Sequence, residues 1–576
     1  MTRKSVPWPA LMILPVVLLV LAGCSKPEAV LPATTVKKVN IPAGIAGTVS
    51  EYADMVGGEP LLVRGYGLVV GLGKNGSSEV PADVKAYLVR QMAKAGVGSA
   101  MAGTAGLTPE AMLADKDTAV VTVGGYLPPG APAGTHFDLL VEALPNTQTA
   151  SLDGGNLMTA DLRIGLMTGA VDAKPLASGK GSVFVNPFID STLPTEQGKL
   201  RSGRILNGGM VTSDRPVRIQ LRTPDYRMAQ LIQRRLNDRF GPTDTVATAQ
   251  SPSLVALKVP RSYARDYDHF LELVAHTYLI DAAGEIERHA RQLASAILLP
   301  TAQHRDISLV WEAMGNQVLP AIRPLYASDN DIAAFFACRA GLRLGDALAG
   351  EPMMQLAAKK SSPMQLEAIA ELGKARGLIK SVQVLRDCLA GDNDMVRIAA
   401  YEALLRRGDS ALQSFSVGSE FTLDIIPGDQ NHVIYATQAG QPRIALFGRT
   451  MPINRPAFYC PPDQLITLNA NQQDPLVKVC RKIPRTGQSS EFLQIKPDTS
   501  ELVRLLGSRA VVSEDGEIHG LGLTYSQVVG VLQNLSKQGQ ITAKFVLQQP
   551  PSMQRIYPFT TGLGRPDRPE DAPVSQ

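Results

Sequence analysis

The sequence predicts an α+β protein of several domains, with β-rich regions toward both ends and a helical segment between them. Three observations support this fold class. The chain has 576 residues, enough for roughly three or four domains. Its 51 glycines and 41 prolines suit turn-rich β structure better than a helical bundle. Residues 286–410, by contrast, are rich in Ala, Leu and Arg and have helical periodicity.

Residues 1–23 are expected to be a bacterial lipoprotein signal peptide. Arg3 and Lys4 form a charged start, and residues 11–21 are apolar but too short to span a bilayer as a mature helix. The sequence Leu-Ala-Gly-Cys that follows resembles a lipoprotein box, so Cys24 is the expected site of lipid attachment. The alternative is an ordinary cleaved signal followed by a chance cysteine.

A lipid at the amino terminus predicts a periplasmic protein held at a membrane. Each buried CH₂ group contributes about 0.8 kcal/mol, so two or more acyl chains give stable anchoring. Ser25 stands where an aspartate would favour retention, which points to the outer membrane. Residues 24–40 are expected to form a tether, with Pro27 and Pro32 and little periodicity. No later stretch is long and apolar enough to cross a membrane.

The net charge of +4 falls to +2 when Arg3 and Lys4 leave with the signal. This charge is too small to argue for nucleic acid or a strongly anionic surface as a partner.

The cysteines after Cys24 are even in number, which permits disulfides in an exported protein. Cys460 and Cys480 lie in one β-rich segment, and a bridge between them would contribute about 3 kcal/mol by loop entropy. Cys338 and Cys388 lie in the helical segment, where they either pair or are simply buried.

Residues 41–175 are predicted to form the first domain. Residues 61–76 form a strand that runs into a glycine-rich turn. A helix follows over residues 81–95, where Pro81 suits the first turn and apolar residues recur at helical spacing. Strands are predicted at residues 118–126 and 136–144; the second shows the alternation of a half-buried strand.

Residues 176–285 are predicted to form a second domain, in the order strand, helix, strand, helix. The strands cover residues 217–221 and 254–259. In the first helix Thr223 is the expected cap, Pro224 the expected opening residue, and the end comes at residues 241–242. The second helix carries apolar residues from 267 to 278.

Residues 286–410 are predicted to be helical and to resemble HEAT-type repeats. Residues 392–404 look like the second helix of such a repeat, and residues 331–341 and 363–373 are weaker relatives about 30 residues apart. The alternative is a plain helical domain.

Residues 411–560 return to β structure, with strands at 421–426, 432–436 and 443–447 and one helix at 524–538. The tail at residues 561–576 is proline-rich and polar, and is predicted to be disordered.

Five segments stand out in order along the chain. They are the glycine-rich strand at residues 63–73, the Tyr-Leu-Pro-Pro sequence at 126–129 with Gly134 and Asp138, the glycine-pair turn at 151–157, the Gly-Arg-Ile-Leu-Asn-Gly-Gly sequence at 203–209, and the helix at 224–236. Together they resemble the flagellar basal-body P-ring protein family, over roughly residues 45–280. The expected lipid and the residues after 286 depart from the family pattern.

The resemblance implies a structural subunit of a periplasmic ring that acts as a bushing around the flagellar rod in the peptidoglycan layer. It implies as partners further copies of the chain, the rod, the outer-membrane L-ring protein and peptidoglycan, with no cofactor and no nucleic acid. Such a ring needs a head-to-tail interface whose rotation closes. The alternative is a non-flagellar periplasmic lipoprotein scaffold that reuses P-ring domains.

Signatures of enzymes are weak in this sequence. Residues 71–76 formally fit G-x-G-x-x-G, but the next helix opens only near residue 81 and no acidic residue follows where a dinucleotide site needs one. His269, Glu272 and His276 can share a helix face, yet the histidines are seven apart, and metal-binding helices usually space them by four. A packed or solvated face is therefore expected, with no catalytic or metal site; a cell-wall-modifying enzyme lacks a recognisable catalytic set.

Two further polar groups have structural interpretations. Asp115 and Asp117 are neighbouring carboxylates in an apparent turn, where a loop role is expected. Five arginines surround the helix of the second domain. They form either a solvated face or a contact with a neighbouring subunit or anionic polymer; the candidate assembly residues are Arg227, Arg234 and Arg235, accompanied by Arg222 and Arg239.

Overall fold

The computed structural model describes residues 46–549, apart from gaps at residues 98–107, 166–173, 190–192, 243, 265, 281, 283, 429–430, 462–463, 483–488, 510 and 513–517. The expected signal peptide with Cys24, the tether and the tail at 561–576 lie outside the described residues. Within the described part, no helix has both the length and the apolarity needed to cross a membrane.

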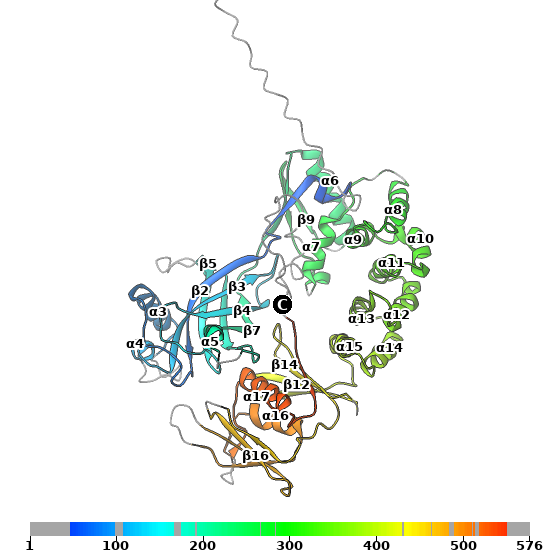
Figure 1. Ribbon diagram of the computed structural model, residues 1–576. Helices are drawn as coiled ribbons and strands as arrows, with labels where there is room; N and C mark the ends of the chain where they lie inside the picture. The colour runs from blue at the N-terminus through cyan, green and yellow to red at the C-terminus, as the bar shows by residue number, and fades with distance from the viewer. Residues whose placement is uncertain are drawn as a thin grey trace, which may run out of the picture. The chain divides into compact units, whose positions relative to one another are not determined.

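Six antiparallel strands close into a barrel in the first part of the chain (Figure 1). The barrel core consists of side chains that alternate along the strands, such as Phe137, Leu139 and Val141, as the half-buried pattern predicts. The three predicted strands in this region are confirmed. In order around the barrel the strands are β2 (Leu61–Val70), β3 (Thr118–Leu127), β4 (His136–Ala143), β7 (Ser202–Val211), β6 (Ala177–Ser182) and β5 (Asn156–Ile164).

The barrel continues past the boundary expected at residue 175. Strands β6 and β7 lie between β5 and β4, so this body of strands runs to Val211. Between β6 and β7 along the chain lie the short helices α5 (Pro194–Gln197) and η2 (Gly198–Arg201). Closure depends on β2 pairing with β5 and on β4 pairing with β7, contacts between segments far apart in the chain. Local periodicity does not encode such pairings.

Two helices cover the outside of the barrel. Helix α3 (Ala82–Lys94) presents Val84, Leu88 and Met92 to the barrel wall, which is the face expected from the sequence. The helix begins one residue later than predicted because Pro81 is its cap and not part of its first turn. Helix α4 (Pro109–Leu113) packs beside α3 and is capped by the hydroxyl of Thr108.

The next body is a four-stranded antiparallel sheet with helices packed on it. The predicted succession of strand, helix, strand and helix is present, with one extra strand, β9, before β10. A strand from before the barrel, β1, completes the sheet. The elements are α2 (Val49–Tyr52), β1 (Ala53–Val56), β8 (Val217–Leu221), α6 (Tyr226–Phe240), β9 (Ala247–Ser251), β10 (Leu254–Leu257), η3 (Arg261–Tyr263) and α7 (Tyr267–Ala275).

The start of α6 differs from the prediction. Thr223 and Pro224 precede the helix, and Asp225 is its cap, since the Asp225 carboxylate accepts a hydrogen bond of 2.8 Å from the backbone N–H of Arg227. A carboxylate at this position also interacts favourably with the positive end of the helix dipole.

The segment predicted to be helical forms an array in which successive helices pack together (Figure 1). The HEAT-like assignment is not confirmed and stays a prediction. The inner faces share one apolar core around Trp311. The helices are α8 (Glu285–Ala296), α9 (His304–Met314), η4 (Asn316–Val318), α10 (Leu319–Ile322), η5 (Arg323–Ala327), α11 (Asp331–Arg343), η6 (Ala347–Ala349), α12 (Gly350–Ala358), α13 (Gln365–Lys374), α14 (Ser381–Leu389) and α15 (Asp394–Arg407).

The last part of the chain contains a mixed five-stranded sheet and a smaller antiparallel sheet of four strands. The three predicted strands and the predicted helix are confirmed. The five-stranded sheet consists of β11 (Gln413–Val417), β12 (Phe421–Ile426), β14 (Arg443–Phe447), β13 (Val433–Ala436) and β21 (Lys544–Leu547). The smaller sheet has β15 (Ala457–Tyr459), β16 (Ile466–Ala470), β17 (Val477–Arg481) and β18 (Leu493–Ile495), and the helices are α16 (Thr499–Gly507) and α17 (Tyr525–Lys537).

The five-stranded sheet is buried on both faces. Tyr435 and Phe447 belong to the core of the helical array. On the other face α16, α17 and the smaller sheet form a core that also includes Phe184 and Leu206 from the barrel region. The sheet therefore has apolar contacts with both neighbours.

Candidate functional site

The glycine-rich segment after β2 is a turn that packs on the loop before β3. The backbone N–H of Gly73 donates to the Asp117 carboxylate, and the N–H of Gly76 donates to the carbonyl of Lys116 at 3.1 Å. A Cβ at Gly76 would collide with the carbonyl oxygen of Thr118. The turn and the loop role of the aspartates are therefore confirmed; the carboxylate of Asp115 accepts from the N–H of Asp117 at 3.0 Å.

The arginines around α6 divide into two groups. Arg222 pairs with Asp54 at 2.6 Å, Arg235 donates to the carbonyl of Tyr278 at 3.3 Å, and Arg239 donates to the carbonyls of Glu312 and Ala313. The side chains of these three arginines thus make contacts within the protein.

Arg227 and Arg234 are exposed. They are seven residues apart, about two helical turns, so both lie on one face of α6. Of the three candidate assembly residues, the structure therefore leaves Arg227 and Arg234 at the surface and engages the guanidinium of Arg235 with the backbone.

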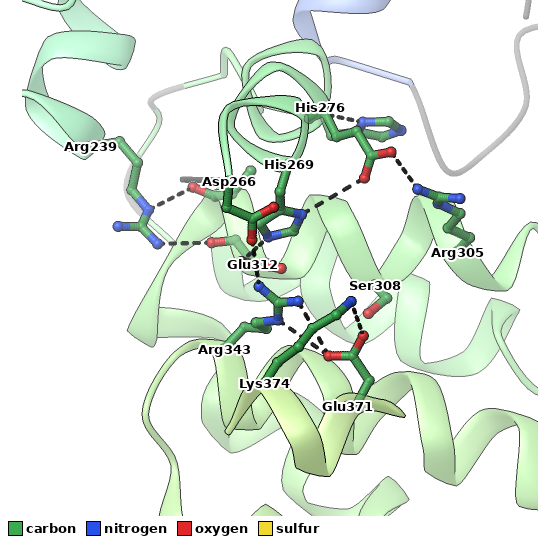
Figure 2. Close-up of polar contacts among 12 residues, drawn as sticks. Arg239, Asp266, His269, His276, Arg305, Ser308, Glu312, Arg343, Glu371 and Lys374 are labelled. Carbon is green, nitrogen blue, oxygen red and sulfur yellow. Dashed lines mark hydrogen bonds and ion pairs between the residues drawn. The ribbon is translucent and has the colours of Figure 1, made fainter. Parts of the chain in front are cut away.

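A buried polar cluster joins α7 to the helical array (Figure 2). His269 Nε2 lies 2.6 Å from Glu312 Oε1 of α9, and His269 Nδ1 lies 3.7 Å from Glu272 Oε2. Arg305 forms an ion pair with Glu272. The predicted packed face of α7 is confirmed, since His269, Glu272 and His276 are all buried.

The cluster continues through Arg343 of α11. Its guanidinium contacts Asp266 at 3.4 Å and Glu371 of α13 at 3.3 Å, and Lys374 contacts Glu371 at 2.9 Å (Figure 2). The ion pairs thus form two sets: one joins α7 to α9, and the other joins Asp266, which caps α7, to α11 and α13.

The electrostatics of the cluster favour the charged forms of its paired groups. Burial opposes ionisation of Glu272, but the hydrogen bond from His269 and the charge of Arg305 lower its pKa to about 2. Burial likewise opposes ionisation of Glu371, yet Arg343, Lys374 and Arg339 lower its pKa to about 2. Burial disfavours the imidazolium of His269, but hydrogen bonds to Glu272 and Glu312 outweigh it and raise its pKa.

Asp268 is the exception in this cluster. Burial, with repulsion from Glu272 and Asp266, raises its pKa to about 7. Its Oδ1 atom is buried and has no hydrogen-bond partner among the described residues. This carboxyl therefore destabilises the fold when it is ionised.

The histidines of α7 have structural partners. His276 Nδ1 lies 2.7 Å from the carbonyl oxygen of Glu272, and its Nε2 lies 3.4 Å from Asp306. In the described part of the chain, no group of three or more His, Cys, Asp or Glu side chains is placed to hold a metal ion. The partners Arg305, Glu312, Arg343 and Glu371 come from three different helices, so no spacing in the sequence indicates them.

The four described cysteines are free thiols, so the predicted Cys460–Cys480 bridge is not formed in this structure. Cys480 pairs across the sheet with Thr467 of β16, and the Thr467 hydroxyl lies 3.8 Å from the Cys460 sulfur on the other side. Strand β16 therefore separates the two cysteines by two strand spacings, about 9.5 Å. A disulfide needs Cα atoms within roughly 7 Å.

Cys338 and Cys388 are buried in the helical array, which is the second of the two interpretations of this pair. Burial raises the pKa of the Cys338 thiol to about 12 and also raises that of Cys388.

Comparison with protein-family models and with curated proteins finds similarity in the first half of the chain. Residues 49–283 match the model of the flagellar P-ring protein family. The flagellar P-ring protein of Geobacter metallireducens is 29% identical over 229 residues, which cover 38% of this chain and 58% of the relative. The P-ring protein of Rhodospirillum rubrum is 32% identical over 234 residues, which cover 38% of this chain and 56% of the relative. That of Anaeromyxobacter dehalogenans is 31% identical over 257 residues, which cover 43% of this chain and 62% of the relative.

The chain thus spans 56–62% of the length of these relatives. The matched segment holds the barrel, the four-stranded sheet and the α7 side of the buried cluster, whereas α9, α11 and α13 lie outside it. Residues 49–283 of this chain are therefore similar to the flagellar P-ring protein family.

Proposed function

We propose that this chain is a structural subunit of a periplasmic ring of the flagellar P-ring type. The observation that carries the proposal is the match of residues 49–283 to this family. The matched segment contains a closed barrel and a sheet with their own apolar cores, which gives the stiffness that a ring subunit needs. Its role is assembly and support, with no reaction catalysed and no cofactor bound.

In this proposal the subunits form a ring around the flagellar rod, within the peptidoglycan layer and next to the outer-membrane L-ring. Head-to-tail contacts between identical subunits close into a ring when the rotation per subunit divides a full turn. A lipid on Cys24 adds a hold on the envelope, on the outer membrane by the Ser25 criterion.

Motility and isolated basal bodies test this function. Deletion of the gene is expected to abolish swimming, and the full chain supplied in trans is expected to restore it. The chain is expected in purified hook–basal bodies at the position of the periplasmic ring. A deletion strain that swims normally removes the bushing role and favours the alternative, a non-flagellar periplasmic scaffold. The observation that favours this alternative is the length of chain outside the match, residues 284–576, which includes the helical array.

The exposed face of α6 is the proposed assembly surface. Arg227 and Arg234 point from one face of the helix, and changing both to Glu reverses two charges without touching the buried side of α6. The double variant is expected to lose ring assembly, and its unfolding curve is compared with that of the parent to separate a lost contact from a lost fold. Lys94→Glu, an exposed cation on α3, is the matched control and is expected to assemble. Normal assembly of the double variant excludes this surface.

The lipid is tested separately. Cys24→Ser is expected to move the protein from the membrane fraction to the soluble periplasmic fraction and to abolish labelling by radioactive palmitate. Unchanged fractionation and labelling exclude acylation at this residue.

A further inference from the structure

The outer wall of the barrel carries a cleft of about 700 Å³. Its lining comes from β2, β3, β4 and β7, together with residues that include Asn186, Lys199 and Gln438. Most lining residues on these strands are the alternate, outward ones, although Val123 and Val141 of the barrel core also border the cleft. Its volume lies in the range of ordinary ligand sites.

Four outward residues of the cleft lie in one row across four strands. Arg64 of β2 pairs with Gly124 of β3, Gly124 pairs with Leu140 of β4, and Leu140 pairs with Arg204 of β7. The row therefore has a guanidinium at each end and a glycine and a leucine between them. Three strand spacings separate its ends, which amounts to about 14 Å.

The arginines at the two ends supply positive charge for carboxylates. Arg64 is exposed. The Arg204 Nε atom is buried and has no hydrogen-bond partner among the described residues. Asp138 lies 3.7 Å from the Arg204 guanidinium, but it also accepts backbone N–H groups from Asn207 at 2.7 Å and Gly440 at 3.0 Å, so its charge is shared. Guanidinium groups bind carboxylates through paired hydrogen bonds.

Other charges near the cleft are few. Lys199 adds a cation that pairs with Glu196 at 2.9 Å, and Glu142 is the one carboxylate of the lining. Glu142 lies opposite Ser202, in the row next to the one that contains Arg64 and Arg204. Its carboxylate therefore does not neutralise the two guanidinium groups directly.

The middle of the row is apolar and uncovered. Leu140 is 51% exposed, and the neighbouring row pairs Leu62 with Tyr126. A Cβ on Gly124 would come no closer than 3.7 Å to other atoms, so no packing constraint demands glycine there. The absence of a side chain at Gly124 leaves open space beside Leu140.

We propose that this cleft binds an extended peptide with acidic side chains at positions i and i+4 and an apolar side chain at i+2. In an extended chain these three side chains point to the same side, and at about 3.3 Å per residue the outer two lie roughly 13 Å apart. This separation matches the distance between the ends of the row. The acidic side chains pair with Arg64 and Arg204, and the apolar one packs on Leu140. The inference does not depend on the proposed ring function.

The test measures binding of the end-blocked, fluorescein-labelled peptide ESLSE to the full chain by fluorescence polarisation. ESLSE is expected to bind the parent protein saturably. Binding is expected to be at least tenfold weaker for the peptide QSLSQ with the parent protein, and for ESLSE with the variant Arg64→Gln. Binding is also expected to weaken with added salt. Arg204→Lys, which keeps the charge but loses the planar fork, is expected to weaken binding in part. Lys94→Gln, on the far helix α3, is the control and is expected to bind as the parent does.

Four outcomes overturn the proposal. The first is no binding at 1 mM peptide, and the second is equal binding of ESLSE and QSLSQ. The third is unchanged binding by Arg64→Gln in a protein whose unfolding curve matches the parent. The fourth is stronger competition by an oligogalacturonate than by unlabelled ESLSE, which assigns the cleft to an anionic glycan.

Discussion

His269 of α7 and Glu312 of α9 are joined by a 2.6 Å contact between Nε2 and Oε1. His269 lies inside the segment that matches the P-ring family, and Glu312 lies outside it. Both side chains are buried, so replacing either one also disturbs the side chains packed around the pair. The contact joins α7 to α9, and Arg239 of α6 also donates to the carbonyl of Glu312.

Replacing Glu312 with Ala is expected to destabilise the protein by about 3–5 kcal/mol, because it leaves a buried His269 without its partner. Urea unfolding followed by the fluorescence of the neighbouring Trp311 measures this change; the other tryptophan of the chain is Trp8. The control is Glu287→Ala, which removes an exposed pair with Arg291 at 3.6 Å and is expected to cost less than about 1 kcal/mol. Equal effects of the two variants would show that the junction contributes little.

The stability that the Glu272 and His269 pairs contribute is expected to be greatest between about pH 4.5 and 6.5. The Glu272 pair stabilises above the ordinary carboxyl pKa of 4.5 and is lost as the pH falls toward its lowered pKa of about 2. The stabilisation from His269 is complete below its ordinary pKa of 6.5 and is lost as the pH rises through its raised pKa. Asp268 also destabilises the protein as the pH rises, because between its ordinary pKa of 3.8 and its raised pKa of about 7 only the folded state keeps the proton, so its contribution falls over this range and levels off above it.

Between pH 5.5 and 8 the free energy of unfolding is therefore expected to fall by about 2 kcal/mol from Asp268 alone. Asp268→Asn is expected to remove this part of the decrease and to stabilise the protein at pH 8. Urea midpoints across this pH range check it, with the exposed Asp238→Asn as the control. An unchanged pH profile in Asp268→Asn would contradict the assignment.

Two glycines of the turn after β2 are expected to respond differently to alanine. A Cβ at Gly76 collides with the Thr118 carbonyl, so Gly76→Ala must displace backbone, at a cost on the order of 3 kcal/mol. Gly71 has φ +83° but open space around it, so Gly71→Ala costs only the backbone strain of about 1–2 kcal/mol. Thermal unfolding of the two variants gives the order; the reverse order would show that the turn relaxes.

Ser526 of α17 links the last part of the chain to the barrel. Its hydroxyl donates to the Asp153 carboxylate at 2.6 Å and accepts from the backbone N–H of Val185 at 3.0 Å. Ser526→Ala leaves both groups without this partner and is expected to lower the free energy of unfolding by about 1–3 kcal/mol. Urea unfolding measures this change. Ser295→Ala, at an exposed position of α8, is the control and is expected to be neutral. A neutral Ser526→Ala would mean that water replaces the hydroxyl.

Thiol labelling tests the separation of the cysteines. In native protein carrying Cys24→Ser, Cys460 is exposed and is expected to react rapidly with a maleimide, whereas the buried Cys338, Cys388 and Cys480 react only after denaturation. Intact mass gives one adduct before denaturation and four after it. No adduct before denaturation, with two thiols recovered only after reduction, would establish the disulfide that the sequence suggested.

The sequence alone determined the elements whose signals are local. Alternation predicted β4, helical spacing predicted α3, and the strand Val217–Leu221 was placed residue for residue. The predicted start of α17 agrees with its capping box, in which Thr524 and Gln527 satisfy each other's backbone groups. The ordered glycine motifs also identified the P-ring family, because a family resemblance is carried by residues in sequence order.

Only the tertiary structure decided which distant residues meet. It closed the barrel through β2 and β5, gave His269 its partner Glu312, placed β16 between Cys460 and Cys480, and aligned Arg64 with Arg204. These relationships depend on the path of the backbone between segments far apart in the chain. Strand register and helix packing set that path, and the pattern of residues within a single segment carries no information about it.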